Sequence, residues 1–137
     1  MPSRAFWNDP DIVDRFAEKD PDERLRTLIE EYDQPELVRV LDLGCAGGRN
    51  TELLAREGFD VHAVDASEAM VERTKRRIAN VLGRGDGDLR VRQMDMTDLG
   101  RFPGETFDLV LALGIYHNAT SWKEWNQAVG ETARVTA

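Results

Sequence analysis

VRVLDLGCAGGRN, residues 38–50, is the stretch that decides the fold we predict for this chain. Its first half is apolar and β-branched apart from Arg39 and Asp42, and it then breaks into three glycines before helix-forming sequence begins. This order predicts a β-strand, a tight glycine loop and an α-helix. Glycines permit unusual backbone angles, and because they lack side chains they let a ligand approach the backbone amides. We therefore interpret the loop as part of a cofactor-binding site.

The composition indicates one globular domain with an acidic surface. The chain has 137 residues, of which 41% are hydrophobic and 32% charged, which is enough for one hydrophobic core. The formal net charge of −8 argues against binding to nucleic acid or to an anionic membrane, so we expect a small-molecule substrate. No apolar run approaches the length of about 20 residues that spans a bilayer, and the N-terminus lacks the features of a signal peptide. We expect a cytoplasmic protein.

The sequence offers few groups for metal binding or redox chemistry. Cys45 is the single cysteine, which excludes an intrachain disulfide, and His62 and His117 are the two histidines. We therefore expect no metal site. Cys45 lies in the glycine loop, where a small apolar residue is sufficient, and we favour a packing role over a reactive thiol.

The rest of the chain alternates between strand and helix patterns. Short apolar runs predict further strands at residues 59–64, 89–94 and 107–113. Helices are expected at residues 51–57, from a Ser67 N-cap to residue 82, and after a Ser121 N-cap, with a turn at residues 83–88. This alternation predicts an α/β fold, a Rossmann-like doubly wound parallel sheet with the strand order 3-2-1-4.

Residues 1–36 precede this core, which we place at residues 37–137, and they have helical patterns of their own. Asp9 is a suitable N-cap for a first helix, and a second helix is expected at about residues 21–32. Both helices precede the first strand, so they would lie across the domain rather than within its sheet. Two interpretations stay open: a lid over the ligand, in which Trp7 would contact the substrate, and ordinary packing of an extension.

An aspartate lies at or near the end of three of the four predicted strands, namely Asp42, Asp65 and Asp95. In a sheet of this kind the ligand lies beyond the carboxyl ends of the strands, so the three carboxylates would meet at one crevice. Asp65 follows the glycine loop by about 20 residues, where an acid accepts hydrogen bonds from ribose hydroxyls. The alternative is that each acid only caps a helix, but three acids in register with a glycine loop favour a ligand.

The glycine loop departs from the loops that bind pyrophosphate. A G-x-G-x-x-G fingerprint starting at Gly44 would need glycine at position 46 and glycine or alanine at position 49, where this chain has Ala46 and Arg49. The Gly-Lys-Ser/Thr of a P-loop is also absent from the sequence. Carboxylates around the crevice suit instead an adenosine that carries positive charge, with an amino group and a sulfonium.

Four motifs, in this order and spacing, resemble the successive cofactor-binding motifs of class I S-adenosylmethionine-dependent methyltransferases. They are LDLGCAGGRN at residues 41–50, HAVDASEAM at 62–70, VRQMDMTDL at 91–99 and FDLVLALGIYHN at 107–118. The resemblance is closest to the small-molecule methyltransferases. It implies an enzyme that transfers a methyl group from S-adenosyl-L-methionine to a small-molecule acceptor by in-line displacement, with S-adenosyl-L-homocysteine as product.

The resemblance also implies roles for individual residues. Asp42 would reach the amino group of the methionine part, Asp65 the ribose hydroxyls and Asp95 the adenine amino group. Tyr116 and His117 would face the methyl group and the substrate, with His117 as the candidate catalytic base. The cofactor site implied in this way comprises Asp42, Gly44, Cys45, Ala46, Gly48, Asp65, Ala66, Met70, Asp95, Met96 and Leu113.

The chain departs from the family pattern in three respects. Ala46 stands where the family's D-x-G-x-G-x-G has its middle glycine, and we expect its methyl group to be tolerated. No Asn/Asp-Pro-Pro-aromatic motif follows the fourth strand, which weighs against methylation of nucleic-acid bases. Finally, the family closes its sheet with about three more strands, so we expect an exposed apolar edge at residues 107–113. Such an edge indicates a truncated domain or a homodimer formed through that strand.

Two further functions are compatible with the sequence. The first is a cofactor-binding module that lacks turnover, or that needs a partner chain or the missing strands to complete its site. The second is an NAD-dependent oxidoreductase, which shares the strand, loop and helix and the acid at Asp65 but not the spacing of the glycines. We favour the methyltransferase over both.

Overall fold

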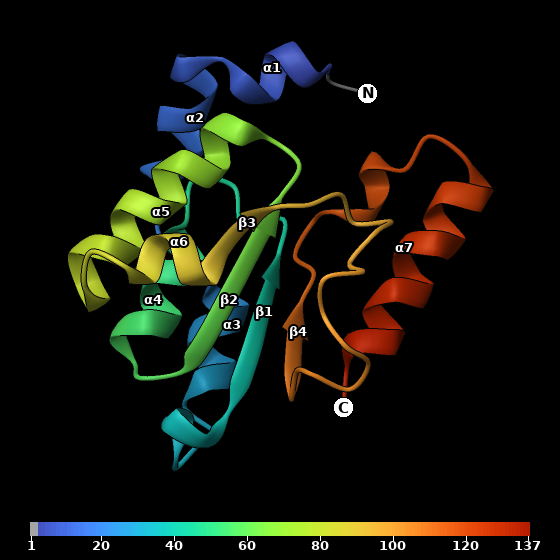
Figure 1. Ribbon diagram of the computed structural model, residues 1–137. Helices are drawn as coiled ribbons and strands as arrows, with labels where there is room; N and C mark the ends of the chain where they lie inside the picture. Colours follow the sequence, from blue (N-terminus) through green and yellow to red (C-terminus); the bar gives the residue numbers. More distant parts are fainter. Residues whose placement is uncertain (1–2) are drawn as a thin grey trace.

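Four parallel strands form one sheet in the order β3-β2-β1-β4 in the computed structural model, which describes residues 3–137 (Figure 1). The strands are β1 (Arg39–Leu43), β2 (Asp60–Asp65), β3 (Val91–Gln93) and β4 (Leu109–Leu111). β1 lies inside the sheet, with Asp42 in register with Ala63 of β2 and with Leu111 of β4. The predicted α/β fold and strand order are confirmed.

Helices precede, connect and follow these strands (Figure 1). The α-helices are α1 (Arg4–Asn8), α2 (Pro10–Ala17), α3 (Glu23–Ile29), α4 (Arg49–Arg56), α5 (Glu68–Leu82), α6 (Asp86–Arg90) and α7 (Trp122–Val135). Two short 3-10 helices are η1 (Pro35–Leu37) and η2 (Tyr116–Asn118). Among the described residues, 3–137, no helix combines the length and the apolar character needed to cross a membrane.

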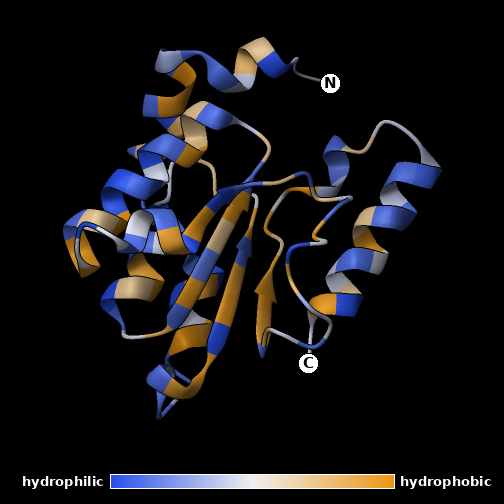
Figure 2. Ribbon diagram, in the orientation of Figure 1, coloured by the Kyte–Doolittle hydropathy of each residue, from blue (hydrophilic) through white to orange (hydrophobic). Residues whose placement is uncertain are grey.

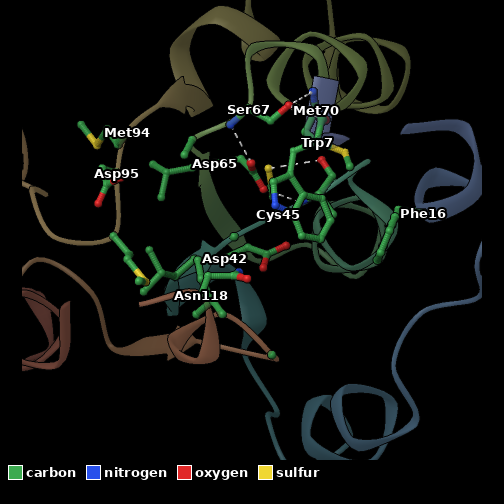
Figure 3. A pocket seen from close by; sticks show the side chains of 18 of the residues that line it. Trp7, Phe16, Asp42, Cys45, Asp65, Ser67, Met70, Met94, Asp95 and Asn118 are labelled. Atoms are coloured by element: carbon green, nitrogen blue, oxygen red, sulfur yellow. Dashed lines mark hydrogen bonds between the residues drawn. The ribbon is translucent and has the colours of Figure 1, made fainter. Parts of the chain in front are cut away.

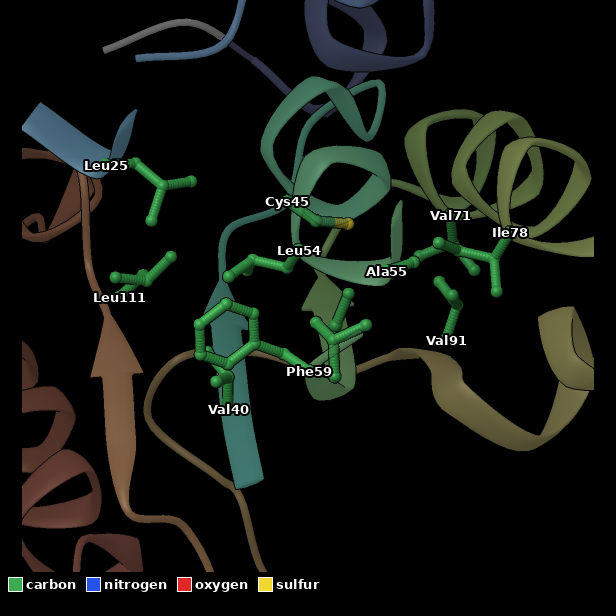
Figure 4. Packing of buried hydrophobic residues seen from close by; sticks show 12 residues of the cluster. Leu25, Val40, Cys45, Leu54, Ala55, Phe59, Val71, Ile78, Val91 and Leu111 are labelled. Carbon is green, nitrogen blue, oxygen red and sulfur yellow. The ribbon is translucent and has the colours of Figure 1, made fainter. Parts of the chain in front are cut away.

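Both faces of the sheet are covered, because alternate residues of a strand point to opposite sides. Val40 faces a buried cluster that includes Leu54 of α4 and Ile78 of α5 (Figure 4). Leu41 faces a second cluster, in which Ala128 of α7 is buried. Figure 2 shows the same division, with hydrophobic strands between helices that carry hydrophilic residues. The near-continuous apolar pattern of the strands is thus explained by burial on both sides.

Three helices begin where the sequence predicts an N-cap. The Asp9 carboxylate accepts hydrogen bonds from the backbone at the start of α2, and the Ser67 hydroxyl accepts one from the Met70 amide in α5. The Ser121 hydroxyl accepts one from the Glu124 amide in α7. These contacts are local, which is why single residues in the sequence predict them.

The structure corrects several predicted boundaries. Residues 83–88 are not only a turn, because α6 begins at Asp86, and the third strand begins at Val91 rather than at residue 89. The reason is tertiary: a methyl group on Gly87 would lie 2.5 Å from the Lys75 carbonyl oxygen, so α6 packs directly on α5 through a residue without a side chain. The fourth strand is confined to Leu109–Leu111, within the predicted 107–113.

Just before β4, Phe107 pairs with the last residues of the chain. The Phe107 amide donates to the Val135 carbonyl at 2.9 Å, and the Ala137 amide donates to the Phe107 carbonyl at 2.7 Å. The side chains of Phe107 and Leu111 are buried, and β4 is the last strand at its side of the sheet, with β1 as its one strand partner among the described residues. A homodimer through this strand stays a prediction.

Candidate functional site

A pocket of about 330 Å³ lies at the carboxyl ends of the strands, within the usual range for small-molecule sites (Figure 3). It is walled by the glycine loop, the ends of β2 and β3, the loop after β4, and α1 and α7. Its lining includes most of the predicted site residues, namely Trp7, Asp42, Gly44, Cys45, Ala46, Asp65, Ala66, Met70, Asp95, Met96 and Leu113. The fold therefore brings residues from all four strand ends to one cavity.

Backbone hydrogen bonds fix the glycine loop to the end of β2. The amides of Gly44 and Cys45 both donate to the Val64 carbonyl, at 2.8 and 3.0 Å. The Ala46 amide donates to Asp65 Oδ2 at 2.9 Å, and Ala46 itself has a left-handed backbone with φ of 51°. This conformation is strained for a non-glycine residue, so Ala46 is held there by its surroundings.

Asp42 is the most deeply buried acid of the site, with 3% of its surface exposed. The Thr51 hydroxyl donates to its Oδ2 at 2.7 Å. Burial raises the pKa of Asp42 to about 6, the Thr51 hydrogen bond opposes that rise, and the nearby Asp65 charge adds to it. A bound cation would therefore stabilise the ionised form of Asp42, because the Asp65 charge lies nearby and no residue of 3–137 forms an ion pair with Asp42.

Asp65 both organises the pocket and faces it. Its Oδ1 accepts a hydrogen bond from the Ser67 amide, and its Oδ2 accepts one from the Ala46 amide, each at 2.9 Å. Burial raises the pKa of Asp65, and the two backbone hydrogen bonds lower it in part. Each carboxylate oxygen has a second lone pair, so these contacts leave acceptor capacity for a ligand.

Asp95 lies beyond β3 on the opposite side of the pocket from β4. Its Oδ1 accepts hydrogen bonds from the Thr97 amide and hydroxyl, at 2.9 and 2.6 Å. Met94 and Met96 flank it, and both are buried and line the pocket. This part of the pocket therefore combines one carboxylate with flexible apolar side chains, a surface that suits a planar ring with an amino group.

Three predicted site residues do not line the pocket. Tyr116 turns away, because its hydroxyl is hydrogen-bonded to Thr132 of α7 at 2.6 Å. His117 is exposed on η2. Gly48 has a φ of 91° at the start of α4, and a methyl group there would lie 3.0 Å from the Thr74 side chain, so Gly48 lets α4 pack against α5.

Other residues line the pocket without having been predicted. They are Arg4, Asn8, Phe16, Leu43, Arg49, Asn50, Val64, Ser67, Met94, Gly114, Ile115, Asn118 and Glu124. Ser67 and Glu124 come from helix starts, where the sequence indicates caps but not ligands. Asn118 stands next to His117 in the fourth motif, yet nothing in the sequence distinguishes it. Arg49 stands out in the sequence only as a departure from the dinucleotide fingerprint.

The N-terminal helices are attached to the rim of the pocket. The Ser67 hydroxyl donates to the Trp7 carbonyl at 2.8 Å, and the Ala69 amide donates to Asn8 Oδ1 at 2.9 Å. The Trp7 ring contacts the Phe16 ring, with 5.5 Å between their centroids. Helix α1 is therefore tied to the N-terminus of α5 while it lines the pocket, and a lid over the ligand stays a prediction.

Comparison with known proteins adds to this geometry. A model of the methyltransferase domain family matches residues 40–137. The ubiquinone biosynthesis O-methyltransferase of Mesorhizobium japonicum is 38% identical over 80 residues, which cover 58% of this chain and 30% of the relative. The magnesium-protoporphyrin O-methyltransferase of Rhodobacter capsulatus is 40% identical over 83 residues, which cover 59% and 34%. This chain thus spans about a third of the length of these relatives.

A solved structure agrees with the family match at the level of the fold. The crystal structure of magnesium protoporphyrin IX methyltransferase from Synechocystis PCC 6803, with bound S-adenosylhomocysteine, superimposes with a TM-score of 0.73. The two chains are 20% identical, and the match covers 97% of this chain and 66% of that one. The parallel sheet therefore has a counterpart in a known enzyme.

Proposed function

This chain belongs to the family of class I S-adenosylmethionine-dependent methyltransferase domains, and from this premise we propose that it transfers the methyl group of S-adenosyl-L-methionine to an oxygen atom of a small molecule. The names of two relatives, a ubiquinone biosynthesis O-methyltransferase and a magnesium-protoporphyrin O-methyltransferase, support oxygen as the acceptor atom. The reaction forms a carbon–oxygen bond, breaks the bond between sulfur and the methyl carbon, and releases S-adenosyl-L-homocysteine.

The observation that carries the proposal is the order of the acids across the sheet. Because the strands run in the order β3-β2-β1-β4, Asp95, Asp65 and Asp42 line the pocket one after another. S-adenosylmethionine presents its hydrogen-bond donors in a matching order: the adenine amino group, the ribose hydroxyls and the α-ammonium. We assign these groups to Asp95, Asp65 and Asp42, respectively.

Arg49 supplies what the methionine end of the cofactor also needs, a cation for the carboxylate. It lines the pocket at the first position of α4, and its charge lowers the pKa of Asp42, which places the two groups within electrostatic reach. Its Nη1 donates to the Asp20 carbonyl at 2.6 Å, so its other donors are available to a ligand. An anion and a cation at one end of the pocket match the two charges of an α-amino acid.

Methyl transfer needs alignment more than it needs chemical groups from the protein. The sulfonium is already an activated leaving group, so holding the acceptor oxygen, the methyl carbon and the sulfur in line supplies most of the acceleration. A hydroxyl acceptor must also lose its proton. Glu124 of α7 lines the pocket and is our candidate for the proton acceptor. His117, the candidate from the sequence, would need η2 to rearrange in order to reach the pocket.

The proposal is tested by calorimetric titration of the chain with S-adenosylmethionine and S-adenosylhomocysteine. We expect both to bind, and we expect Asp65→Ala to weaken both at least about tenfold, because a carboxylate that accepts ribose hydroxyls is lost. Asp33→Ala is the matched control, since Asp33 is exposed and lies outside the pocket. Failure of the folded wild-type chain to bind either compound would refute the proposal.

A second function also has observations in its favour. Neither histidine lines the pocket, and the match covers only about a third of the O-methyltransferases that the chain resembles. Both facts fit a module that binds the cofactor and needs further residues for turnover. Transfer of a labelled methyl group from S-adenosylmethionine to any phenol or carboxylic acid, by this chain alone, would exclude this alternative.

A further inference from the structure

The side-chain carbonyl oxygen of Asn118, Oδ1, is buried in the pocket without a hydrogen-bond partner. Among the described residues, 3–137, two buried side-chain polar atoms have no hydrogen-bond partner, His62 Nδ1 and Asn118 Oδ1. His62 lies against the Phe102 and Phe107 rings, away from the pocket. Asn118 lines the pocket. Because an unpaired buried carbonyl oxygen is costly, Asn118 Oδ1 is a candidate acceptor for a donor that a ligand brings.

The position of Asn118 in the sheet says which part of the ligand it meets. It follows β4, the neighbour of β1, and Asp42 is in register with Leu111 of β4. On the alignment proposed above, the adenine lies towards β3, so Asn118 meets the methionine end.

Resting on the proposed function, we propose that Asn118 is a cofactor-binding residue whose Oδ1 accepts a hydrogen bond from the α-ammonium group of S-adenosylmethionine, together with Asp42. The methionine end has one kind of N–H or O–H donor, this ammonium, because the carboxylate and the sulfonium have none. Thr51 already donates to Asp42 Oδ2. Asn118 Oδ1 and the remaining lone pairs of Asp42 then share the three ammonium protons.

The local structure holds Asn118 ready for this contact. The backbone amide of Asn118 donates to the Ile115 carbonyl at 3.0 Å, and the backbone amide of Ala119 donates to the Tyr116 carbonyl at 3.1 Å. These two hydrogen bonds hold the backbone of η2 in its turn. The Tyr116 hydroxyl fixes that turn to Thr132 of α7. On this proposal Tyr116, predicted from the sequence to face the substrate, helps to position Asn118, two residues further along the chain.

The test compares three probes that differ only at the amino-acid end: S-adenosylhomocysteine, its decarboxylated analogue, which keeps the amine, and 5′-methylthioadenosine, which lacks both groups. Binding of each is measured by calorimetry, with competition for the weak ones. Asn118→Leu removes the amide oxygen at similar size, Asn118→Asp keeps an acceptor, and Asn126→Leu is the control on the exposed side of α7.

We expect Asn118→Leu to bind the two amine-containing probes about 10- to 100-fold more weakly, as for loss of a hydrogen bond to a charged group, with unchanged affinity for 5′-methylthioadenosine. Asn118→Asp should keep most of the affinity, and Asn126→Leu all of it. The inference is overturned if Asn118→Leu binds S-adenosylhomocysteine like the wild type, which would assign Asn118 to the methyl acceptor, or if it loses all three probes alike, which would indicate a structural role. In both cases binding by the wild type leaves the proposed function standing.

Discussion

The glycine loop with α4 and α5 differs sharply in packing from the segment β4–η2–α7 on the other side of the pocket. Around the loop the backbones touch: a methyl group on Gly47 would lie 2.5 Å from the Cα of Ala17 in α2. In α7, by contrast, Gly130 has no atom within 4 Å of such a methyl group, and Trp122 is 79% exposed. The side of the pocket formed by the glycine loop is fixed by close contacts, whereas the side formed by β4–η2–α7, which carries Asn118 and Glu124, is packed less closely.

Gly47→Ala is expected to show the largest effect, because the clash is with helix backbone rather than with a flexible side chain. We predict that the free energy of unfolding falls by about 3 kcal/mol, the upper end for overpacking, and that α2 separates from the loop. Urea denaturation measures the change. A loss below about 0.5 kcal/mol, the usual size for surface substitutions, would show that α2 adapts freely and that the two regions do not differ as described.

Asp42→Asn measures how much stability the protein loses by burying the Asp42 carboxylate in the close-packed region. A raised pKa means that the folded protein favours the protonated acid, so this contribution to stability is full below the unfolded pKa and is lost as the pH rises through about 6. At 1.36 kcal/mol per pKa unit, and allowing for burial of the amide, we expect the variant to be about 2 kcal/mol more stable than the wild type at pH 7.

The pH dependence makes this prediction specific. The advantage of Asp42→Asn in urea denaturation should shrink as the pH falls below about 6 and be nearly gone at about pH 3, below the unfolded pKa of 3.8, where Asp42 is protonated in the folded and largely in the unfolded wild type. The same variant should bind S-adenosylhomocysteine more weakly at pH 7, because the ammonium loses its anion. A stability difference that stays constant between pH 4 and pH 7 would contradict burial of the Asp42 carboxylate as the cause.

Gly130→Ala is the counterpart of Gly47→Ala in the loosely packed region. Since the added methyl group meets no atom within 4 Å and lies in a helix, we expect stabilisation by about 0.5–1 kcal/mol from helix propensity. Thermal unfolding of the two alanine variants, side by side, should therefore show changes of opposite sign. Destabilisation by Gly130→Ala would mean that this face of α7 is occupied in solution.

His117→Ala should have the smallest effect on cofactor binding. His117 is exposed and lies outside the pocket, so we expect the dissociation constant for S-adenosylhomocysteine to change by no more than about twofold. Calorimetry with the wild type as reference is sufficient. A loss of binding would show that η2 rearranges to bring His117 to the cofactor. His117 would then contact the cofactor as Asn118 is proposed to do, and the two residues would no longer differ in this respect.

The sequence predicts best where the deciding contacts are between neighbours in the chain. The Ser67 and Ser121 caps depend on backbone amides three residues away, and both are confirmed. Helix α6 is not predicted, because its presence depends on Gly87 lying against the Lys75 carbonyl, on a helix that precedes it in the chain. No local pattern in GRGDGD reports that contact.

The sequence by itself determined the alternation of strands and helices and the acids at the strand ends, because hydrophobic period and strand direction follow from the order of residues alone. From these, Asp42, Asp65 and Asp95 could be assigned to one pocket. Only the tertiary structure decided which side of η2 faces that pocket. The Tyr116 hydroxyl binds Thr132, sixteen residues further along the chain, and this contact turns Tyr116 away while Asn118 lines the cavity. In a turn of three residues the direction of each side chain is set by what it packs against.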